Sequence, residues 1–251
     1  MQESNNPQKR RFFMRLNMIV ILCLTGGVLA HLYADPMKAE KKNQWATVYT
    51  PKVETWKGTT IPAVFLGDSI FHGWNWSASE PNNPGGLEIW NHDFQDFKPE
   101  NLSISGDRVE HLLWRITEGR QLSGYTAKVV VVLIGVNNLI RNEDPASVAA
   151  GIVNLNKEIL KQQPTARILL LGILPYSWDR NGSAEKVNLL IRKSADGGKI
   201  VYLDLTSEFK DQSGKTRHLR DGIHPNPEGY QKMADRLGPE VRKLLQQPGN
   251  A

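Results

Sequence analysis

Short apolar runs alternate with helical patterns along most of the chain, starting near residue 61. The runs occupy residues 61–66, 101–105, 127–134, 166–174 and 199–205. The third and fourth are almost entirely hydrophobic, which is typical of strands covered on both faces. Apolar residues three or four positions apart predict helices over residues 108–119, 147–163, 184–195 and 227–246, the last with a break at Gly238-Pro239. This alternation predicts an α/β fold, a three-layer α/β/α sandwich with a mostly parallel five-stranded sheet.

The first 34 residues have a different pattern. Four cationic residues within positions 9–15 precede an apolar stretch over residues 18–30, an order that is typical of a secretory signal peptide. The stretch is shorter than the roughly 20 residues of a transmembrane helix. We therefore expect residues 1–34 to be a signal peptide that is cleaved after Ala34, with a retained signal anchor as the alternative. The protein would then be periplasmic or secreted, and only this segment would contact a membrane.

The remaining chain divides into residues 35–57, a polar linker or packed arm, and residues 58–251, a single domain. The formal charge of +5 includes a net +3 in residues 1–34, which leaves +2 for the rest. No basic patch indicates a nucleic-acid partner. Cys23, the only cysteine, lies in the apolar stretch, so we expect neither disulfides nor thiol chemistry in the mature protein.

Small and polar residues follow the predicted strands, where ligands of parallel sheets gather. The motifs are "GDS" at 67–69, "SGDR" at 105–108, "GVNN" at 135–138 and "DGIHPN" at 221–226. A serine becomes a good nucleophile when a histidine takes its proton and a third group orients that histidine. Asp221 and His224 stand three apart on a predicted turn, and the carboxylate would orient the imidazole toward Ser69. His72 is a rival base.

Acyl transfer also requires hydrogen-bond donors for the oxyanion. The candidates are the backbone N–H groups of Ser69 and Gly106 and the side-chain amide of Asn137. They come from separate loops that would converge at one edge of the sheet.

These motifs resemble the SGNH hydrolases, also called GDSL esterases or lipases, in content and order. The resemblance rests on "GDSI", "ISGDR", "GVNN" and "DGIHPN" and covers the chain from Ile61 onward. It implies the family's flavodoxin-like sandwich, with Ser69 as nucleophile, Gly106 and Asn137 as oxyanion donors, and His224 as base beside Asp221. "GLEIWNHDF", "GDRVEHLLWRI" and "GVNNLI" are similar to the branch with the catalytic subunits of platelet-activating factor acetylhydrolase. "NLSISGD" and "DGIHPN" are also similar to the periplasmic thioesterase/lysophospholipase branch.

The resemblance implies an exported serine esterase that acts on a short-chain acyl ester, such as an acetyl ester, without cofactor or metal. The substrate would be a small-molecule, lipid or acylated-carbohydrate ester, and the oligomeric state is open. The alternatives are a lysophospholipase or thioesterase with a longer acyl slot, an acyltransferase, and a non-catalytic carbohydrate- or lipid-binding module.

Four further residues are candidates for substrate contacts, each with a structural alternative. Asp68 is a structural acid or part of the oxyanion loop. Arg108 meets an anionic group of the substrate or begins a surface helix. Trp74 and Trp76 flank a polar loop and line a sugar or acyl pocket, or else pack in the core, as tryptophan commonly does. A metal site at Asp221 and His224 is disfavoured because no third ligand accompanies them.

Overall fold

The structure is a computed structural model that describes residues 35–42 and 50–247. The predicted signal peptide or anchor, residues 1–34, lies outside the described residues. Part of the predicted linker, residues 43–49, does so too. Within the described part of the chain, no helix is both long and apolar enough to cross a lipid bilayer.

Five parallel strands form one sheet in the order β2-β1-β3-β4-β5. They are β1 (Thr60–Gly67), β2 (Glu100–Asn101), β3 (Thr126–Leu133), β4 (Arg167–Leu171) and β5 (Ile200–Leu203). The α/β fold predicted from the apolar runs is confirmed. After β1 the chain builds β2 on one side and β3 on the other. The carboxyl ends of β1 and β3 therefore flank the switch point at which such sheets bind ligands.

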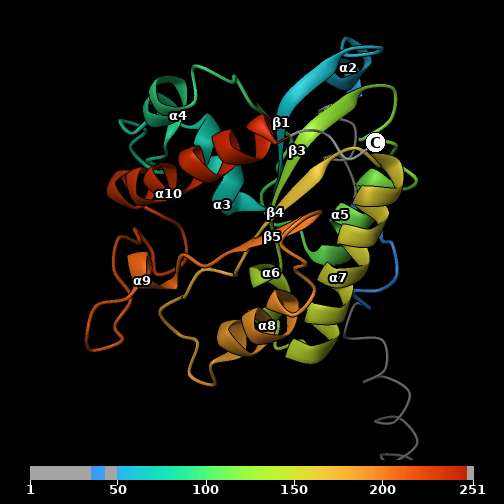
Figure 1. The fold of residues 1–251 in the computed structure, drawn as a ribbon. Coiled ribbons are helices and arrows are strands. Elements are labelled where there is room, and N and C mark those ends of the chain that lie inside the picture. Colours follow the sequence, from blue (N-terminus) through green and yellow to red (C-terminus); the bar gives the residue numbers. More distant parts are fainter. Residues whose placement is uncertain (1–34, 43–49, 248–251) are drawn as a thin grey trace, which may run out of the picture. The chain divides into compact units, whose positions relative to one another are not determined.

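Helices cover both faces of the sheet (Figure 1). One layer contains α3 (Ser69–His72), α4 (Leu87–Asp93) and α10 (Pro227–Gln246), and the other contains α5 (Val109–Ile116), α7 (Pro145–Gln162) and α8 (Ser183–Arg192). The shorter elements are α2 (Thr50–Glu54), η3 (Gly73–Asn75), α6 (Val136–Leu139) and α9 (Thr206–Phe209). Because the sheet is covered on both faces, every residue of β4 is buried.

The predicted break at Gly238-Pro239 is wrong, because α10 continues through both residues. A proline inside a helix removes one backbone hydrogen bond and costs about 3 kcal/mol. Pro239 and Asp235, the residue four positions before it, are both exposed, so water can solvate the carbonyl that loses its partner. Buried side chains along the opposite stripe, including Tyr230 and Leu237, anchor the helix to the core.

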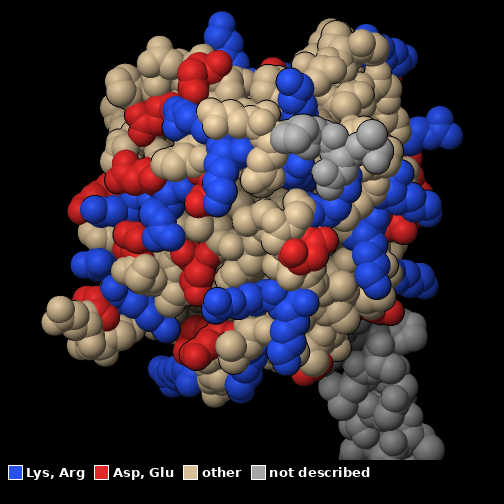
Figure 2. All heavy atoms as spheres, in the orientation of Figure 1, with Lys and Arg blue, Asp and Glu red and all other residues tan. Residues whose placement is uncertain are grey.

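Residues of the predicted linker pack against the domain where the structure describes them. Val53 of α2 and Trp56 are buried in the core, and the Trp56 ring meets Tyr125 edge to face with centroids 5.2 Å apart. On the face of the molecule shown in Figure 2, acidic and basic side chains are interspersed. This face therefore lacks the continuous basic surface on which nucleic-acid backbones bind.

Candidate active site

The predicted catalytic and oxyanion residues lie just beyond the carboxyl ends of strands or on the loop before α10. Ser69 begins α3 directly after β1, and Asn137 lies in α6 directly after β3. Gly106 follows β2, the outer neighbour of β1. The topology therefore gathers three separate loops at the β1/β3 switch point.

A chain of hydrogen bonds joins Ser69, His224 and Asp221. The Ser69 Oγ lies 2.8 Å from the His224 Nε2, and the His224 Nδ1 lies 2.7 Å from the Asp221 Oδ2. Because a carboxylate only accepts hydrogen bonds, Nδ1 carries the proton and Nε2 is free to accept one from Ser69. This arrangement has the geometry of a nucleophile, a general base and an orienting acid.

The turn that carries His224 also holds Asp221 as a carboxylate. Burial acts to raise the pKa of Asp221, but hydrogen bonds from the backbone and ring of His224 and from the Ile223 N–H lower it below its usual value. The Asp221 Oδ1 accepts both backbone N–H groups, at 3.1 Å from Ile223 and 2.8 Å from His224. Asp221 is therefore ionised and oriented before any substrate binds.

Gly67 and Asp68 explain how Ser69 is presented. A Cβ on Gly67 would lie 2.4 Å from the Leu133 carbonyl oxygen on β3, so only glycine fits at the end of β1. The Asp68 Oδ1 then accepts the Ile70 N–H at 3.0 Å and caps α3. The turn therefore ends β1 immediately, and Ser69 becomes the first residue of α3.

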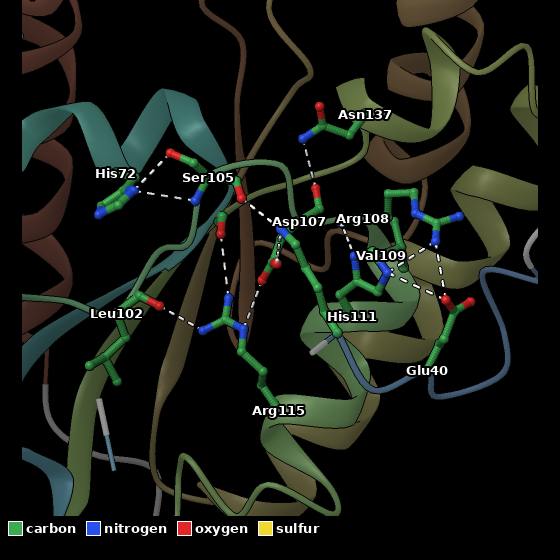
Figure 3. A network of polar contacts seen from close by, with 12 residues as sticks. Glu40, His72, Leu102, Ser105, Asp107, Arg108, Val109, His111, Arg115 and Asn137 are labelled. Atoms are coloured by element: carbon green, nitrogen blue, oxygen red, sulfur yellow. Dashed lines mark hydrogen bonds and ion pairs between the residues drawn. The ribbon is translucent and has the colours of Figure 1, made fainter. Parts of the chain in front are cut away.

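A tight turn after β2 presents Gly106. We call residues 104–107 the Gly106 turn; the Asp107 N–H closes it on the Ile104 carbonyl at 3.1 Å. Gly106 has φ +73°, the conformation that a type II turn requires at its third position and that glycine adopts without strain. The Asn137 amide donates to the Asp107 carbonyl at 2.8 Å, so the two candidate oxyanion loops are joined (Figure 3).

The side chains of Arg115 and His72 hold the Gly106 turn in place through polar contacts. The Arg115 guanidinium pairs with the Asp107 carboxylate at 2.8 Å and donates to the Leu102 carbonyl at 2.6 Å (Figure 3). The His72 Nδ1 lies 2.8 Å from the Ser105 Oγ. His72, the rival base in the sequence, is thus bonded to the Gly106 turn, whereas the ring bonded to Ser69 is that of His224.

Two of the predicted substrate contacts are core residues in the structure. Trp74 is fully buried and packs edge to face on Tyr230, with ring centroids 4.7 Å apart. Asp68 is 1 % exposed and serves as the cap of α3. Neither side chain reaches the surface, which favours the structural alternative for each, and their contact with substrate stays a prediction.

Arg108 is also engaged by the protein. Its guanidinium lies 3.3 Å from Glu40 and 3.0 Å from the His111 Nε2 (Figure 3). It also lies 2.7 Å from a Glu110 carboxylate oxygen. The ligand atoms of these three neighbours lie within 4.8 Å of one another, close enough to surround a metal ion. Arg108 already supplies a cation there, and the carboxylates of Glu40, Glu110 and Glu143 pair with it, so it does not offer a free charge to an anionic substrate.

The loops around the catalytic turn contain residues that the sequence did not single out. Trp178 is 49 % exposed, and a Cβ on Gly222 would lie 2.8 Å from its ring, so the indole packs on the turn between Asp221 and His224. A cavity of about 530 Å³ lies beside the segment that carries Trp178, and its lining includes Tyr176 and Ser177. Trp178 is recognised as a neighbour of the catalytic turn only from its contact with Gly222 in the folded structure.

Trp76 is the remaining predicted contact, and it is half-buried. Its ring lies beside His72, with centroids 5.2 Å apart, and below the Arg220 guanidinium at 5.5 Å. Arg220 in turn lies 3.7 Å from the Asp221 carboxylate. Trp76 therefore adjoins the catalytic turn, and its contact with substrate stays a prediction.

Replacing Asp68 by Asn should change how stability depends on pH. Burial, and secondly the nearby Asp107 charge, raise the pKa of Asp68 from 3.8 to about 7. The folded protein then keeps a proton that the unfolded chain releases, so the free energy of unfolding falls as pH rises from about 4 to about 8, by up to about 4 kcal/mol. Asn retains the capping oxygen but does not ionise, so this fall should be absent from Asp68→Asn.

Urea unfolding of both proteins at pH 5, 6, 7 and 8 measures this difference. The stability of Asp68→Asn relative to the wild type should increase steadily with pH. Parallel curves for the two proteins would show that Asp68 does not titrate in this range.

Comparison with known proteins agrees with the geometry of the site. The model of the GDSL-like lipase/acylhydrolase family matches residues 65–232. The platelet-activating factor acetylhydrolase IB subunit alpha1 of Rattus norvegicus is 30% identical over 210 residues, which cover 81% of this chain and 85% of the relative. The alpha2 subunit of the same organism is 32% identical over 167 residues, 64% of this chain and 71% of the relative.

A solved structure, a GDSL-like lipase from Bacteroides thetaiotaomicron, shares the fold with a TM-score of 0.62 at 20% sequence identity. The match covers 80% of this chain and 99% of that one. The resemblance to the SGNH hydrolases, which rested on short motifs at strand ends, is confirmed over most of the domain. This chain belongs to the GDSL-like lipase/acylhydrolase family and is an ester-hydrolysing enzyme.

Proposed function

We propose that the protein is a serine esterase that removes a short acyl group, such as acetyl, from an alcohol through an acyl-enzyme. The observation that carries the proposal is the hydrogen-bonded chain from Ser69 through His224 to Asp221. A non-catalytic binding module has no need of a histidine held between a serine and a carboxylate. The short acyl group is inferred from the relatives, whose names describe acetylhydrolases.

In the first step, the Ser69 Oγ attacks the ester carbonyl carbon while the His224 Nε2 takes the hydroxyl proton. The carbonyl π electrons move onto oxygen, and the resulting oxyanion accepts hydrogen bonds from the N–H groups of Ser69 and Gly106 and from the Asn137 amide. Collapse of this intermediate breaks the bond to the alcohol, which leaves with the proton from His224. Asp221 stabilises the imidazolium throughout.

In the second step, water attacks the acyl-Ser69 carbonyl and gives its proton to His224. The second oxyanion occupies the same donors, and its collapse releases the carboxylic acid and returns the proton to Ser69. In this scheme, His224 accepts and then returns the proton in both steps.

We also propose that the enzyme is exported. The support is the basic segment followed by the apolar stretch within residues 1–34. Mass spectrometry of the protein purified from the cell envelope tests this, since cleavage after Ala34 predicts a mature chain that begins at Asp35.

A series of p-nitrophenyl esters tests the acyl preference. We expect kcat/KM to be highest for the acetate and butyrate and to fall by about tenfold or more for the decanoate, because a short acyl pocket cannot bury the longer chain. A fluorophosphonate probe should add a single adduct to the intact protein. Faster hydrolysis of the decanoate would favour a lysophospholipase or thioesterase, and the absence of both hydrolysis and adduct would favour a binding module.

A further inference from the structure

A short segment before the domain, Pro36–Lys42, lies directly against the catalytic domain; we call it the N-terminal arm. At one end, a Cβ on Gly151 of α7 would lie 2.6 Å from Pro36, so the arm and the helix are in close contact. In the middle, the Glu40 N–H donates to the Glu110 carbonyl at 3.1 Å. The arm is therefore attached to the layer of helices that contains α5 and α7. Its last residue, Lys42, lies at the active site.

Lys42 ends the arm and binds the Gly106 turn at two points. Its Nζ donates to the Ser105 carbonyl at 2.6 Å and pairs with the Asp107 Oδ1 at 3.2 Å. A Cβ on Gly106 would lie 3.2 Å from the same nitrogen. The ammonium thus bridges the residues on either side of Gly106, and the buried carboxylate of Asp107 holds it there.

The carbonyl that Lys42 binds belongs to the central peptide of the turn. This peptide joins Ser105 to Gly106, so it consists of the Ser105 carbonyl and the Gly106 N–H. No peptide bond in the described residues is cis, and in a planar trans peptide the carbonyl and the N–H point in opposite directions. Fixing the Ser105 carbonyl on Lys42 therefore fixes the direction of the Gly106 N–H on the opposite side.

The central peptide is also the part of a tight turn that rotates most easily. Type I and type II turns differ by a rotation of about 180° of this peptide, and glycine at the third position permits both. If the peptide rotated here, the Gly106 N–H would point away from the oxyanion and the Ser105 carbonyl would take its place. Within residues 35–42 and 50–247, the structure shows no other donor to the Ser105 carbonyl.

We propose that Lys42 is a positioning residue that holds the Ser105–Gly106 peptide in the orientation in which the Gly106 N–H serves the oxyanion. The inference rests on the proposed function, because it assigns a purpose to the oxyanion donors of the same site. It implies that the arm before the domain is required for turnover.

Lys42→Met tests this role, with Lys42→Arg and Lys41→Met beside it. Lys41 belongs to the same arm, but its ammonium lies 5.3 Å from the Trp114 ring instead of on the turn. We expect Lys42→Met to lower kcat for p-nitrophenyl acetate by about tenfold to a hundredfold, with KM changed by about twofold at most. Lys42→Arg should recover most of the loss, and Lys41→Met should match the wild type.

A trifluoromethyl ketone gives a second readout, since its adduct with Ser69 carries an oxyanion. Its inhibition constant should rise in Lys42→Met by about the factor by which kcat falls. If Lys42→Met does not fold, Lys42→Gln replaces it. Lys42→Gln keeps a donor but lacks the ionic bond to Asp107, so we expect a smaller loss of kcat than in Lys42→Met, with the inhibition constant rising by about the same factor as this smaller loss.

Three results would overturn the proposal: an unchanged kcat in Lys42→Met, a loss that appears only in KM, or an equal loss in Lys41→Met. Each presupposes an active wild type, so each leaves the proposed function intact. A wild type that neither hydrolyses esters nor reacts with a fluorophosphonate would instead refute the proposed function, and this inference with it.

Discussion

Ser69→Ala should abolish ester hydrolysis, with kcat lower than that of the wild type by about 10⁵-fold or more. The reason is that the alanine methyl group cannot attack a carbonyl, while the rest of the site stays in place. The fold should be retained, because alanine is a good helix former for the first residue of α3 and the Asp68 cap remains. Hydrolysis of p-nitrophenyl acetate and thermal melting of the variant measure the two effects.

Ser79→Ala is the matched control, since Ser79 lies exposed on a polar loop. It should hydrolyse the ester and react with the fluorophosphonate as the wild type does, whereas Ser69→Ala should do neither. An adduct on folded Ser69→Ala, or retained turnover, would show that another residue is the nucleophile.

His224→Ala should lower kcat by about 10⁴-fold or more at neutral pH. Without the imidazole, the Ser69 hydroxyl keeps its proton and the leaving alcohol lacks a proton donor. Asp221 still accepts the backbone N–H groups of its own turn, so the loop should keep its shape. Added imidazole that enters the vacated space should restore part of the rate in a concentration-dependent way.

Variants of two other histidines test whether the assignment of His224 as the general base is specific. His92→Ala should retain wild-type activity, because the His92 side chain is 83% exposed. His72→Ala removes a hydrogen bond to Ser105 rather than to Ser69 and should cost far less than His224→Ala. If His72→Ala proved the more damaging of the two, the general base would have been misassigned.

Local features of the chain were sufficient to predict the sheet and the candidate catalytic residues. Continuous apolar runs fall on β3 and β4 because strands covered on both faces have no polar side to display. Glycine and aspartate at the strand ends indicate turns, since glycine permits positive φ and aspartate bonds to the backbone two residues on. Ser69, Asp221 and His224 could therefore be assigned to loops at one edge of the sheet.

Sequence periodicity was less informative where packing compensates for a poor residue. Pro239 has a strong local preference against a helix interior, yet α10 continues through it because the helix buries a long apolar stripe. Trp74 carried the same local signal as Trp76, but the aromatic core encloses only the first.

The sequence by itself determined the alternation along the chain of five strands with the helices α5, α7, α8 and α10, the strand ends that carry the site, and the residue types suited to acyl transfer. These depend on backbone conformation and on side-chain periodicity, which neighbouring residues set. Only the tertiary structure decided what each polar group is bonded to. The contact between Lys42 and Ser105 spans 63 positions, and the partners of Arg108 come from separate segments. Such pairs form where elements pack together, so no local pattern encodes them.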